Sequence, residues 1–268
     1  MKGLWTVGLV VVVLLSAVLL TMGCGSESSV FVDLIKKVPH DSSTVDFMDI
    51  EKLRDDPDFE GAYEDWKMAY DLQGQYGINH DQVETFIMTE SIYLVQGGFD
   101  MSDVVDRLLH LGYEYDRYKD VERWSSGNVH VALMERMVVA GSKDGVESCI
   151  KIAKGEDSSL YEKRDARDVV EKLPHGLQMW WALAASYSEL EGLEASGMSL
   201  AKEDRDILKM TTVCKFTDEG TAEDSGNTLK QEWEDSRFGK VDTKIDGIYV
   251  TIRGEISIDE FGEPDILE

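Results

Sequence analysis

Two histidines occur in the same short pattern, and histidine is the side chain best suited to transfer protons or bind metals near neutral pH. The pattern is Lys-aliphatic-Pro-His, at residues 37–40 and again at residues 172–175. If His40 and His175 met across a twofold axis, they would form a metal-binding or catalytic pair. The alternative is that Pro fixes φ and the histidine closes a turn before a strand. We favour the turn and keep both histidines as candidate ligand or partner contacts.

Residues 56–61, DPDFEG, are similar to the start of a calcium loop, with oxygen ligands at its first, third and fifth positions and glycine at its sixth. The twelfth position should supply a bidentate glutamate, and here it is Lys67. We therefore expect Asp56 and Asp58 to begin a helix, whose first turn favours carboxylates. No metal site is predicted, although weak calcium binding by the acidic surface, including residues 259–265, stays an alternative.

Trp180 and Trp181 are adjacent in an apolar run at residues 177–183 that is typical of a strand. Adjacent strand residues face opposite sides, so one tryptophan can enter the core while the other faces a groove. An exposed tryptophan would be a contact for a peptide, a glycan or another protein. The continuous apolar run instead favours a strand that is buried on both faces.

Motifs for the common catalytic mechanisms are missing. The Ser-x-x-Lys pattern occurs twice, at Ser148/Lys151 and Ser199/Lys202, without its companion elements, and no Gly-x-Ser-x-Gly elbow is present. No phosphate-binding glycine loop occurs either. We expect no enzyme and no cofactor, and a hydrolase is only the third hypothesis.

The cysteines beyond the N-terminal segment are Cys149 and Cys214. Each lies among apolar neighbours, which favours two buried thiols. If the chain is exported, a disulfide between them is also allowed, and the spacing leaves both alternatives open.

The N-terminus is typical of an export signal. Lys2 precedes an apolar run at residues 4–20, and Gly23 and Cys24 are followed by a Gly/Ser-containing spacer. Cleavage before Cys24 would remove residues 1–23, leave Cys24 lipidated and make residues 24–30 a flexible tether. The alternative is an uncleaved anchor helix. Both place the remaining chain outside the cytoplasm, attached to the cell membrane.

The lipoprotein-type signal and the tandem aliphatic-Pro steps resemble families of uncharacterised exported prokaryotic lipoproteins. The resemblance implies an envelope location and no particular activity.

Charge excludes one class of partner. Lys and Arg number 27 against 53 Asp and Glu, which gives a net charge of -26. So acidic a chain, with no basic stripe, repels phosphates, and we expect no nucleic acid partner.

The surrounding elements predict an α+β fold of two similar tandem units with mostly antiparallel sheets, residues 31–155 and 156–268. Each unit reads as a strand, a helical linker, a strand, a helix and several further strands. In the first unit these are the linker at 51–77, the strand at 83–95, the helix at 100–111 and strands at 113–118, 129–134 and 137–140. In the second they are the Glu-rich linker at 188–197, the strand at 207–216, the helix at 222–236 and strands at 240–245, 248–252 and 255–258.

These features predict a lipid-anchored, extracytoplasmic and non-enzymatic interaction module of the cell envelope. Its expected partners are the membrane, through the anchor, and an envelope protein or a small ligand. The alternative is a small-ligand or calcium-binding protein whose site lies between the two units, because such sites favour domain interfaces.

Overall fold

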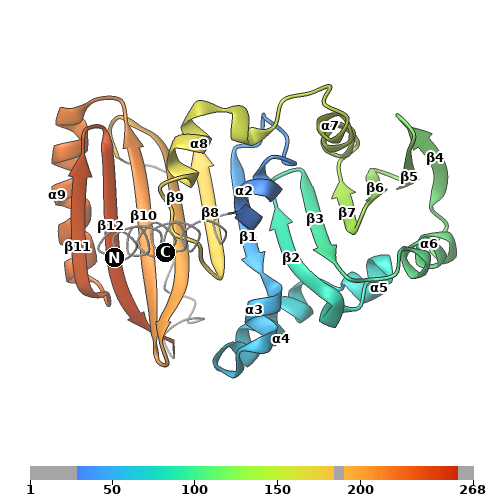
Figure 1. Cartoon of the computed structure of the whole chain (residues 1–268), viewed down its shortest axis with the longest axis horizontal. Coiled ribbons are helices and arrows are strands. Elements are labelled where there is room, and N and C mark those ends of the chain that lie inside the picture. The colour runs from blue at the N-terminus through green and yellow to red at the C-terminus, as the bar shows by residue number, and fades with distance from the viewer. Residues whose placement is uncertain (1–28, 184–189, 259–268) are drawn as a thin grey trace, which may run out of the picture. The chain divides into compact units, whose positions relative to one another are not determined.

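The computed structural model describes residues 29–183 and 190–258, and twelve strands of these residues form one sheet (Figure 1). The strand order is β11-β12-β10-β9-β8-β1-β2-β3-β7-β6-β5-β4. Neighbouring strands are antiparallel throughout. The fold is therefore mixed α and β with an antiparallel sheet, as the sequence predicted.

The elements from residues 29 to 153 include seven of these strands. In chain order they are α2 (Ser29–Ile35), β1 (Thr44–Asp49), α3 (Ile50–Asp55), η1 (Pro57–Phe59), α4 (Glu60–Ala69), α5 (Leu72–Tyr76), η2 (His80–Gln82), β2 (Val83–Met88), β3 (Ile92–Gly97), α6 (Met101–His110), β4 (Glu114–Tyr118), β5 (Val121–Ser126), β6 (Val129–Met134), β7 (Met137–Gly141) and α7 (Lys143–Ala153).

The remaining described elements supply the other five strands. They are η3 (Leu160–Glu162), α8 (Arg164–Val170), β8 (Gln178–Leu183), β9 (Leu193–Asp204), β10 (Ile207–Phe216), α9 (Glu219–Asp235), β11 (Gly239–Asp246) and β12 (Tyr249–Ser257).

The strand order runs in the same way on both sides of the β1/β8 pair. From β1 outward it is β1-β2-β3-β7-β6, and from β8 outward it is β8-β9-β10-β12-β11. The β4–β5 hairpin extends the sheet only on the β1 side. Helix α6 follows β3 in the chain, and α9 follows β10. In strand order, β7 and β6 thus occupy the places of β12 and β11.

Adjacent strand residues point to opposite sides, so the sheet has two faces. Helices pack against both of them. Phe47 and Trp181 lie in one core with Phe31 of α2, Val146 of α7 and Val169 of α8. We call this side face A.

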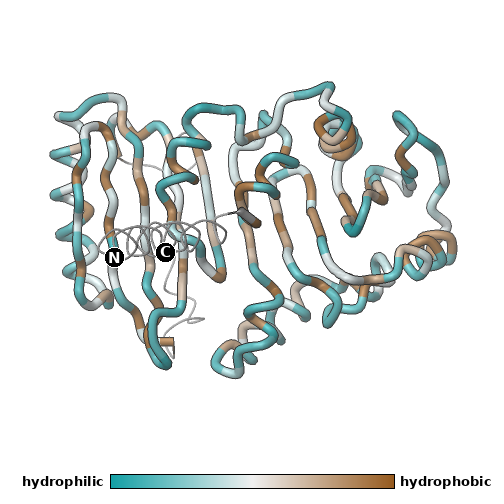
Figure 2. The backbone as a smooth tube through the Cα atoms, viewed as in Figure 1, coloured by the Kyte–Doolittle hydropathy of each residue, from teal (hydrophilic) through white to brown (hydrophobic). Residues whose placement is uncertain are grey.

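On the opposite side, face B, Met48 and Phe86 pack with Leu53 of α3, Trp66 of α4 and Leu108 of α6. Helix α9 covers face B at the other end, where Ala222 packs with Cys214 and Ile252 in a smaller core. Figure 2 shows a mostly hydrophilic α9 and β11, with apolar segments in the inner strands and also in α6 and α7.

Helix α6 shows how local sequence sets an element. The Asp100 carboxylate accepts hydrogen bonds from the backbone N–H and the hydroxyl of Ser102, which caps the first turn. Gly112, with φ of +76°, follows the helix in the left-handed conformation that glycine adopts easily. The helix predicted at residues 100–111 is confirmed.

Several predicted elements are wrong in detail. Residues 83–95 are not one strand but the β2–β3 hairpin, because the Thr89 hydroxyl accepts hydrogen bonds from Ser91 and Ile92 and turns the chain. The Glu-rich linker expected at residues 188–197 contains the start of β9 from Leu193 onward, paired on both sides. The two strands expected at residues 248–252 and 255–258 are one strand, β12 (Tyr249–Ser257), which continues through Gly254.

The two predicted units both contribute to this one sheet. Their predicted boundary at residue 155 lies in the connection between α7 and η3. By its contacts the chain divides into Met1–Val30 and Phe31–Glu268, and nearly all described residues belong to the second part. Among the described helices, none is both long and apolar enough to cross a membrane.

Candidate functional site

The two predicted histidines lie at opposite ends of the β1/β8 pair. Thr44 pairs with Ala182 and Met48 with Gln178, so the strand starts that follow His40 and His175 are four residues apart along the ladder. At about 3.3 Å per residue, this places the turns roughly 13 Å apart before the turns themselves are counted. The two histidines are therefore not brought together.

His175 instead contacts the end of β1. Its Nε2 atom lies 3.8 Å from Oδ2 of Asp49, beyond hydrogen-bond distance, so the contact is an ion pair when the imidazole is protonated. Burial by itself raises the pKa of Asp49, but His175 and the backbone N–H and ammonium of Lys52 hold this pKa below its ordinary value. His40 is exposed, in the turn after Pro39. The position of His40 agrees with the turn interpretation, whereas His175 lies in the irregular connection between α8 and β8.

The two tryptophans face opposite sides of β8, as predicted. Trp181 is fully buried on face A, and Lys163 places its ammonium 5.9 Å from the centre of the Trp181 ring. Trp180 is half-buried on face B. The strand therefore presents one tryptophan to the core and keeps the other partly accessible.

Cys149 and Cys214 are free thiols, so the structure contains no bridge between them. Cys149 lies on α7 in the face A core, and Cys214 lies on β10 among residues covered by α9. Burial raises the pKa of each thiol to about 12. Thiols with this pKa are protonated and unreactive at neutral pH. Cys24, the predicted lipidation site, lies outside the described residues.

The calcium-like loop holds a cation that belongs to the chain itself. The Lys202 ammonium of β9 lies 2.6 Å from carboxylate oxygens of both Asp56 and Asp58. Asp56 also caps the short helix η1 through the backbone N–H of Asp58. These two carboxylates thus fasten η1 to β9. The other acidic candidate, residues 259–265, lies outside the described part of the chain.

A buried lysine cluster was not predicted from the sequence. Lys215 of β10 is 5 % exposed, and its ammonium donates to Asp165 and lies 3.4 Å from Asp168 and 3.6 Å from Glu194. Burial opposes its charge, but the carboxylates raise the pKa of Lys215 above its ordinary value. The Tyr249 hydroxyl also donates to Asp168. A lysine held in its charged form is no nucleophile, and the cluster ties α8 to the sheet.

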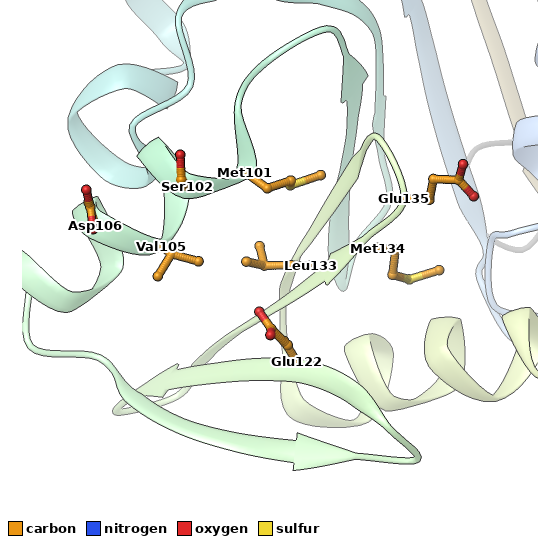
Figure 3. Close-up of a pocket in the computed structure, with 8 residues that line it drawn as sticks. All are labelled: Met101, Ser102, Val105, Asp106, Glu122, Leu133, Met134 and Glu135. Carbon is orange, nitrogen blue, oxygen red and sulfur yellow. The ribbon is translucent and has the colours of Figure 1, made fainter.

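A hollow lies on face B between α6 and the β5–β6 strands, with a volume of about 420 Å³ (Figure 3). Its floor is apolar: Met101 and Val105 come from α6 and Leu133 comes from β6. Met134 also lines the hollow, but its side chain packs against the face A core. These residues are separated by about thirty positions in the sequence, and no local pattern links them.

The rim of the hollow is acidic. Asp106, Glu122 and Glu135 line it together with Ser102. Glu122 projects from the same side of the sheet as Leu133, because the two residues are directly paired across β5 and β6. None of the three carboxylates makes an ion pair with a lysine or arginine of the described residues.

The nearest arginines in the sequence are each engaged elsewhere. Arg107 donates to the backbone carbonyl of Gly74, and Arg136 binds the Glu84 carboxylate. Arg123, next to Glu122, points to the opposite face of the sheet and there binds Asp116 and Glu147. Arg117 of β4 is paired directly with Glu122 across the strands, but its guanidinium donates to the backbone carbonyl of Asp120 and forms no ion pair with Glu122. The hollow therefore keeps three carboxylates without an ion pair among the described residues.

A second hollow, of about 670 Å³, lies beside the end of α7 and η3. Its polar groups are already partnered. Glu156 binds Lys119, and Glu162 accepts from the backbone N–H of Ser159. Within residues 29–183 and 190–258, no three His, Cys, Asp or Glu side chains are grouped so that they could hold a metal ion.

Comparison with known proteins gives relatives without a described activity. No family model matches the chain. The uncharacterized protein MJ0635 of Methanocaldococcus jannaschii is 26 % identical over 259 residues, which cover 89 % of this chain and 91 % of that protein. The uncharacterized protein MJ1281 of the same organism is 22 % identical, and the match covers 94 % of this chain but only 25 % of MJ1281.

A solved structure shares the fold. Crystal form I of TP0453 superposes with a TM-score of 0.50 at 9 % identity, and covers 84 % of this chain and 93 % of that chain. At this identity the likeness concerns the fold alone.

Proposed function

We propose that this protein is a non-enzymatic binding module, tethered to the outer side of the cell membrane, whose partner binds the hollow between α6 and the β5–β6 strands. The observation that carries the function is the composition of that hollow: an apolar floor with three carboxylates, none of which forms an ion pair among the described residues. Apolar surface favours association, and uncompensated carboxylates select for positive charge.

The groups in the hollow favour binding over catalysis. Its hydroxyl, on Ser102, donates to the Asp100 carboxylate as part of the helix cap. A serine nucleophile needs a neighbouring base that accepts its proton, and the Asp100 contact already has a structural role in α6. The remaining polar groups that line the hollow are the three carboxylates.

The tether is proposed from the sequence of residues 1–24. Its test is metabolic labelling of the full chain with a clickable lipid precursor, comparing Cys24→Ala with the matched Cys214→Ala variant. Label on the wild type and on Cys214→Ala, but not on Cys24→Ala, is expected. Unlabelled protein of full-length mass in the membrane fraction would instead support the uncleaved anchor, and label on Cys24→Ala would contradict lipidation at this site.

We also propose that residues 31–155 and 156–268 are two copies of one ancestral unit. The matching strand orders on the two sides of β1/β8 support this, as does the position of α6 after β3 and of α9 after β10. The copies would then differ in the helices α3 to α5 between β1 and β2, in the β4–β5 hairpin and in the length of the helix on face B.

The hollow also favours a second candidate function, the binding of a small organic cation. Its volume of about 420 Å³ lies within the roughly 300–1,000 Å³ that is common for small-ligand sites. Such a ligand would sit within residues 31–155 and not between the two units, where the sequence led us to expect a site.

Binding at the hollow is tested by a photo-crosslinking amino acid at Val105 of the full chain, in membranes of its native cells. The control places the same group at Met68 of α4, which is 75 % exposed and far from the hollow in the sequence. A discrete adduct from Val105 and none from Met68 is expected. Identical adducts from both positions, or none from Val105, would contradict a binding role for the hollow.

A further inference from the structure

The two helices that follow equivalent strands cover face B to different extents. Helix α9 has 17 residues and lies against β11 and β12, where Ala222 and Gly226 are buried. A Cβ atom on Gly226 would come within 3.0 Å of the Ile245 side chain, so the helix backbone rests closely on these strands. In Figure 1, α9 runs along β11.

Helix α6 has only 10 residues, which is about 15 Å of helix against about 25 Å for α9. It buries Val104 and Leu108 against face B but leaves the hollow beside Val105 and Leu133 uncovered. The open floor thus lies on strands β5 and β6, and β6 holds the place that β11 holds under α9. A helix is the shape of element that this fold packs against such strands.

Apolar surface continues beyond the hollow. Met101, Val105 and Leu109 are spaced four residues apart and therefore lie along one side of α6. Leu109 is 56 % exposed, and Tyr115 of β4, which pairs with Trp124 on face B, is 50 % exposed. An exposed apolar strip of this kind marks an interaction surface.

The charge around the strip specifies the partner. Asp106, Glu122 and Glu135 rim the floor, and the whole chain carries a net charge of -26. From this juxtaposition of an uncovered apolar floor with an acidic rim, we infer that the hollow binds a basic amphipathic helix of a partner protein. The apolar side of that helix would pack on Val105 and Leu133, and its lysines or arginines would pair with the rim. This inference rests on the proposed binding function and names its partner class.

The test uses the full chain in zwitterionic lipid nanodiscs and a fluorescent 18-residue Leu/Lys peptide with its leucines on one helical side. Empty nanodiscs correct for binding to lipid. A peptide with Glu in place of Lys, and a scrambled Leu/Lys peptide, are the probe controls. We expect saturable binding of the basic amphipathic peptide, much weaker binding of both controls, and loss of affinity as salt is raised.

The variants separate the hollow from the general acidity of the chain. The triple variant Asp106→Asn, Glu122→Gln, Glu135→Gln removes three rim charges. Its matched control, Glu223→Gln, Asp224→Asn, Glu232→Gln, removes three charges from exposed positions on α9. The rim variant should weaken peptide binding at least about fivefold and the control by less than about twofold, because three close ion pairs are lost only in the first. Equal weakening by the two variants would overturn the inference.

Failure of the helix inference is distinguishable from failure of the proposed function. If the basic peptide does not bind while Val105 still gives its discrete adduct in native membranes, the partner is not a basic helix and the binding role stands. If the peptide does not bind and Val105 gives no adduct, both are wrong.

Discussion

Val45 of β1 lies directly opposite Trp181 of β8, and both side chains are fully buried at the joint between the two halves of the sheet. The residues are far apart in the sequence, yet β1 and β8 are the only described strands that connect the two halves. Side chains paired across neighbouring strands are the unit of sheet stabilisation, so this joint should control the cooperative unfolding of residues 31–258.

Replacing Trp181 should therefore be costly. Trp181→Ala removes a large side chain from the face A core and should lower the free energy of unfolding by about 3–5 kcal/mol. Trp181→Phe should cost less, because it keeps most of the volume and removes an indole N–H that has no hydrogen-bond partner among the described residues. Trp180→Ala, on the half-buried side, is the control. Urea unfolding measures all three, and a larger loss for Trp180→Ala than for Trp181→Ala would contradict this account of the joint.

The Lys215 cluster predicts a second large effect. Lys215→Met leaves Asp165, Asp168 and Glu194 without their shared cation and should cost about 3–5 kcal/mol of stability at neutral pH. Lys244→Met, at an exposed position on β11, is the control.

The same cluster gives an alkaline pH dependence. Because the folded-state pKa of Lys215 is raised above 10.5, its contribution is fully present below that pH and is lost as the pH rises through the folded-state pKa. The difference in melting temperature between the wild type and Lys215→Met should therefore narrow above pH 10.5. A difference that does not change with pH would show that the methionine acts through packing instead.

Glu90 predicts an acid-dependent effect. Its carboxylate accepts hydrogen bonds from the backbone N–H groups of Ser43, at 2.8 Å, and Thr44, at 3.4 Å, and so fastens the β2–β3 turn to the start of β1. Partial burial raises the pKa of Glu90, but these hydrogen bonds hold it below 4.5 overall. The resulting stability is present above pH 4.5 and is lost as the pH falls through the lowered pKa.

Glu90→Gln should consequently lower stability by about 0.5–1 kcal/mol at neutral pH, since the carboxylate is exposed. Below the lowered pKa the variant and the wild type should converge. Glu223→Gln on α9 should show neither behaviour. Thermal unfolding between pH 3 and pH 7 measures this, and parallel curves for wild type and Glu90→Gln would refute the role of the carboxylate.

The thiols give a chemical prediction. With the pKa of Cys149 and Cys214 at about 12 and both side chains buried, neither should react with maleimide at pH 7.5 in the folded chain. Both should react in denaturant. A Met68→Cys variant, at an exposed position, is the positive control and should be labelled at once. Peptide mapping by mass spectrometry identifies the modified sites, and a Cys149–Cys214 disulfide in the non-reduced digest would contradict the structure.

Local signals were sufficient for much of the fold. Asp100 and Gly112 marked the two ends of α6 because a helix cap and a left-handed glycine are set by neighbouring residues. The β2–β3 hairpin was missed because its turn, at residues 89–91, contains no glycine, asparagine or proline. Strand β9 was missed because the glutamates at its start read as a helix, while its actual state is decided by pairing with β8 and β10.

The candidate site could not be predicted for a different physical reason. Val105 and Leu133 each look like ordinary core residues in their own segments. Only the packing of α6 across face B shows that both remain uncovered beside Glu122. The separation of His40 and His175 could not be predicted for the same reason. It depends on the antiparallel register of β1 and β8, which places the two histidines at opposite ends of the pair and is decided by contacts between segments far apart in the sequence.

Asp46 predicts a stabilising substitution at the same central joint. It lies on face B of β1, paired with Met88 and Trp180, and burial raises its pKa above the ordinary value of 3.8. When burial raises the folded-state pKa of a carboxyl group, the free energy of unfolding of the protein falls as the pH rises towards that pKa, because the buried charged form is disfavoured. Asp46→Asn keeps the shape and removes the charge, so it should raise the melting temperature at pH 7 and have little effect at pH 3. The control is Asp55→Asn, at an exposed position. A lower melting temperature for Asp46→Asn at pH 7 would mean that the carboxylate has a stabilising partner, and would overturn the assignment of burial as the cause.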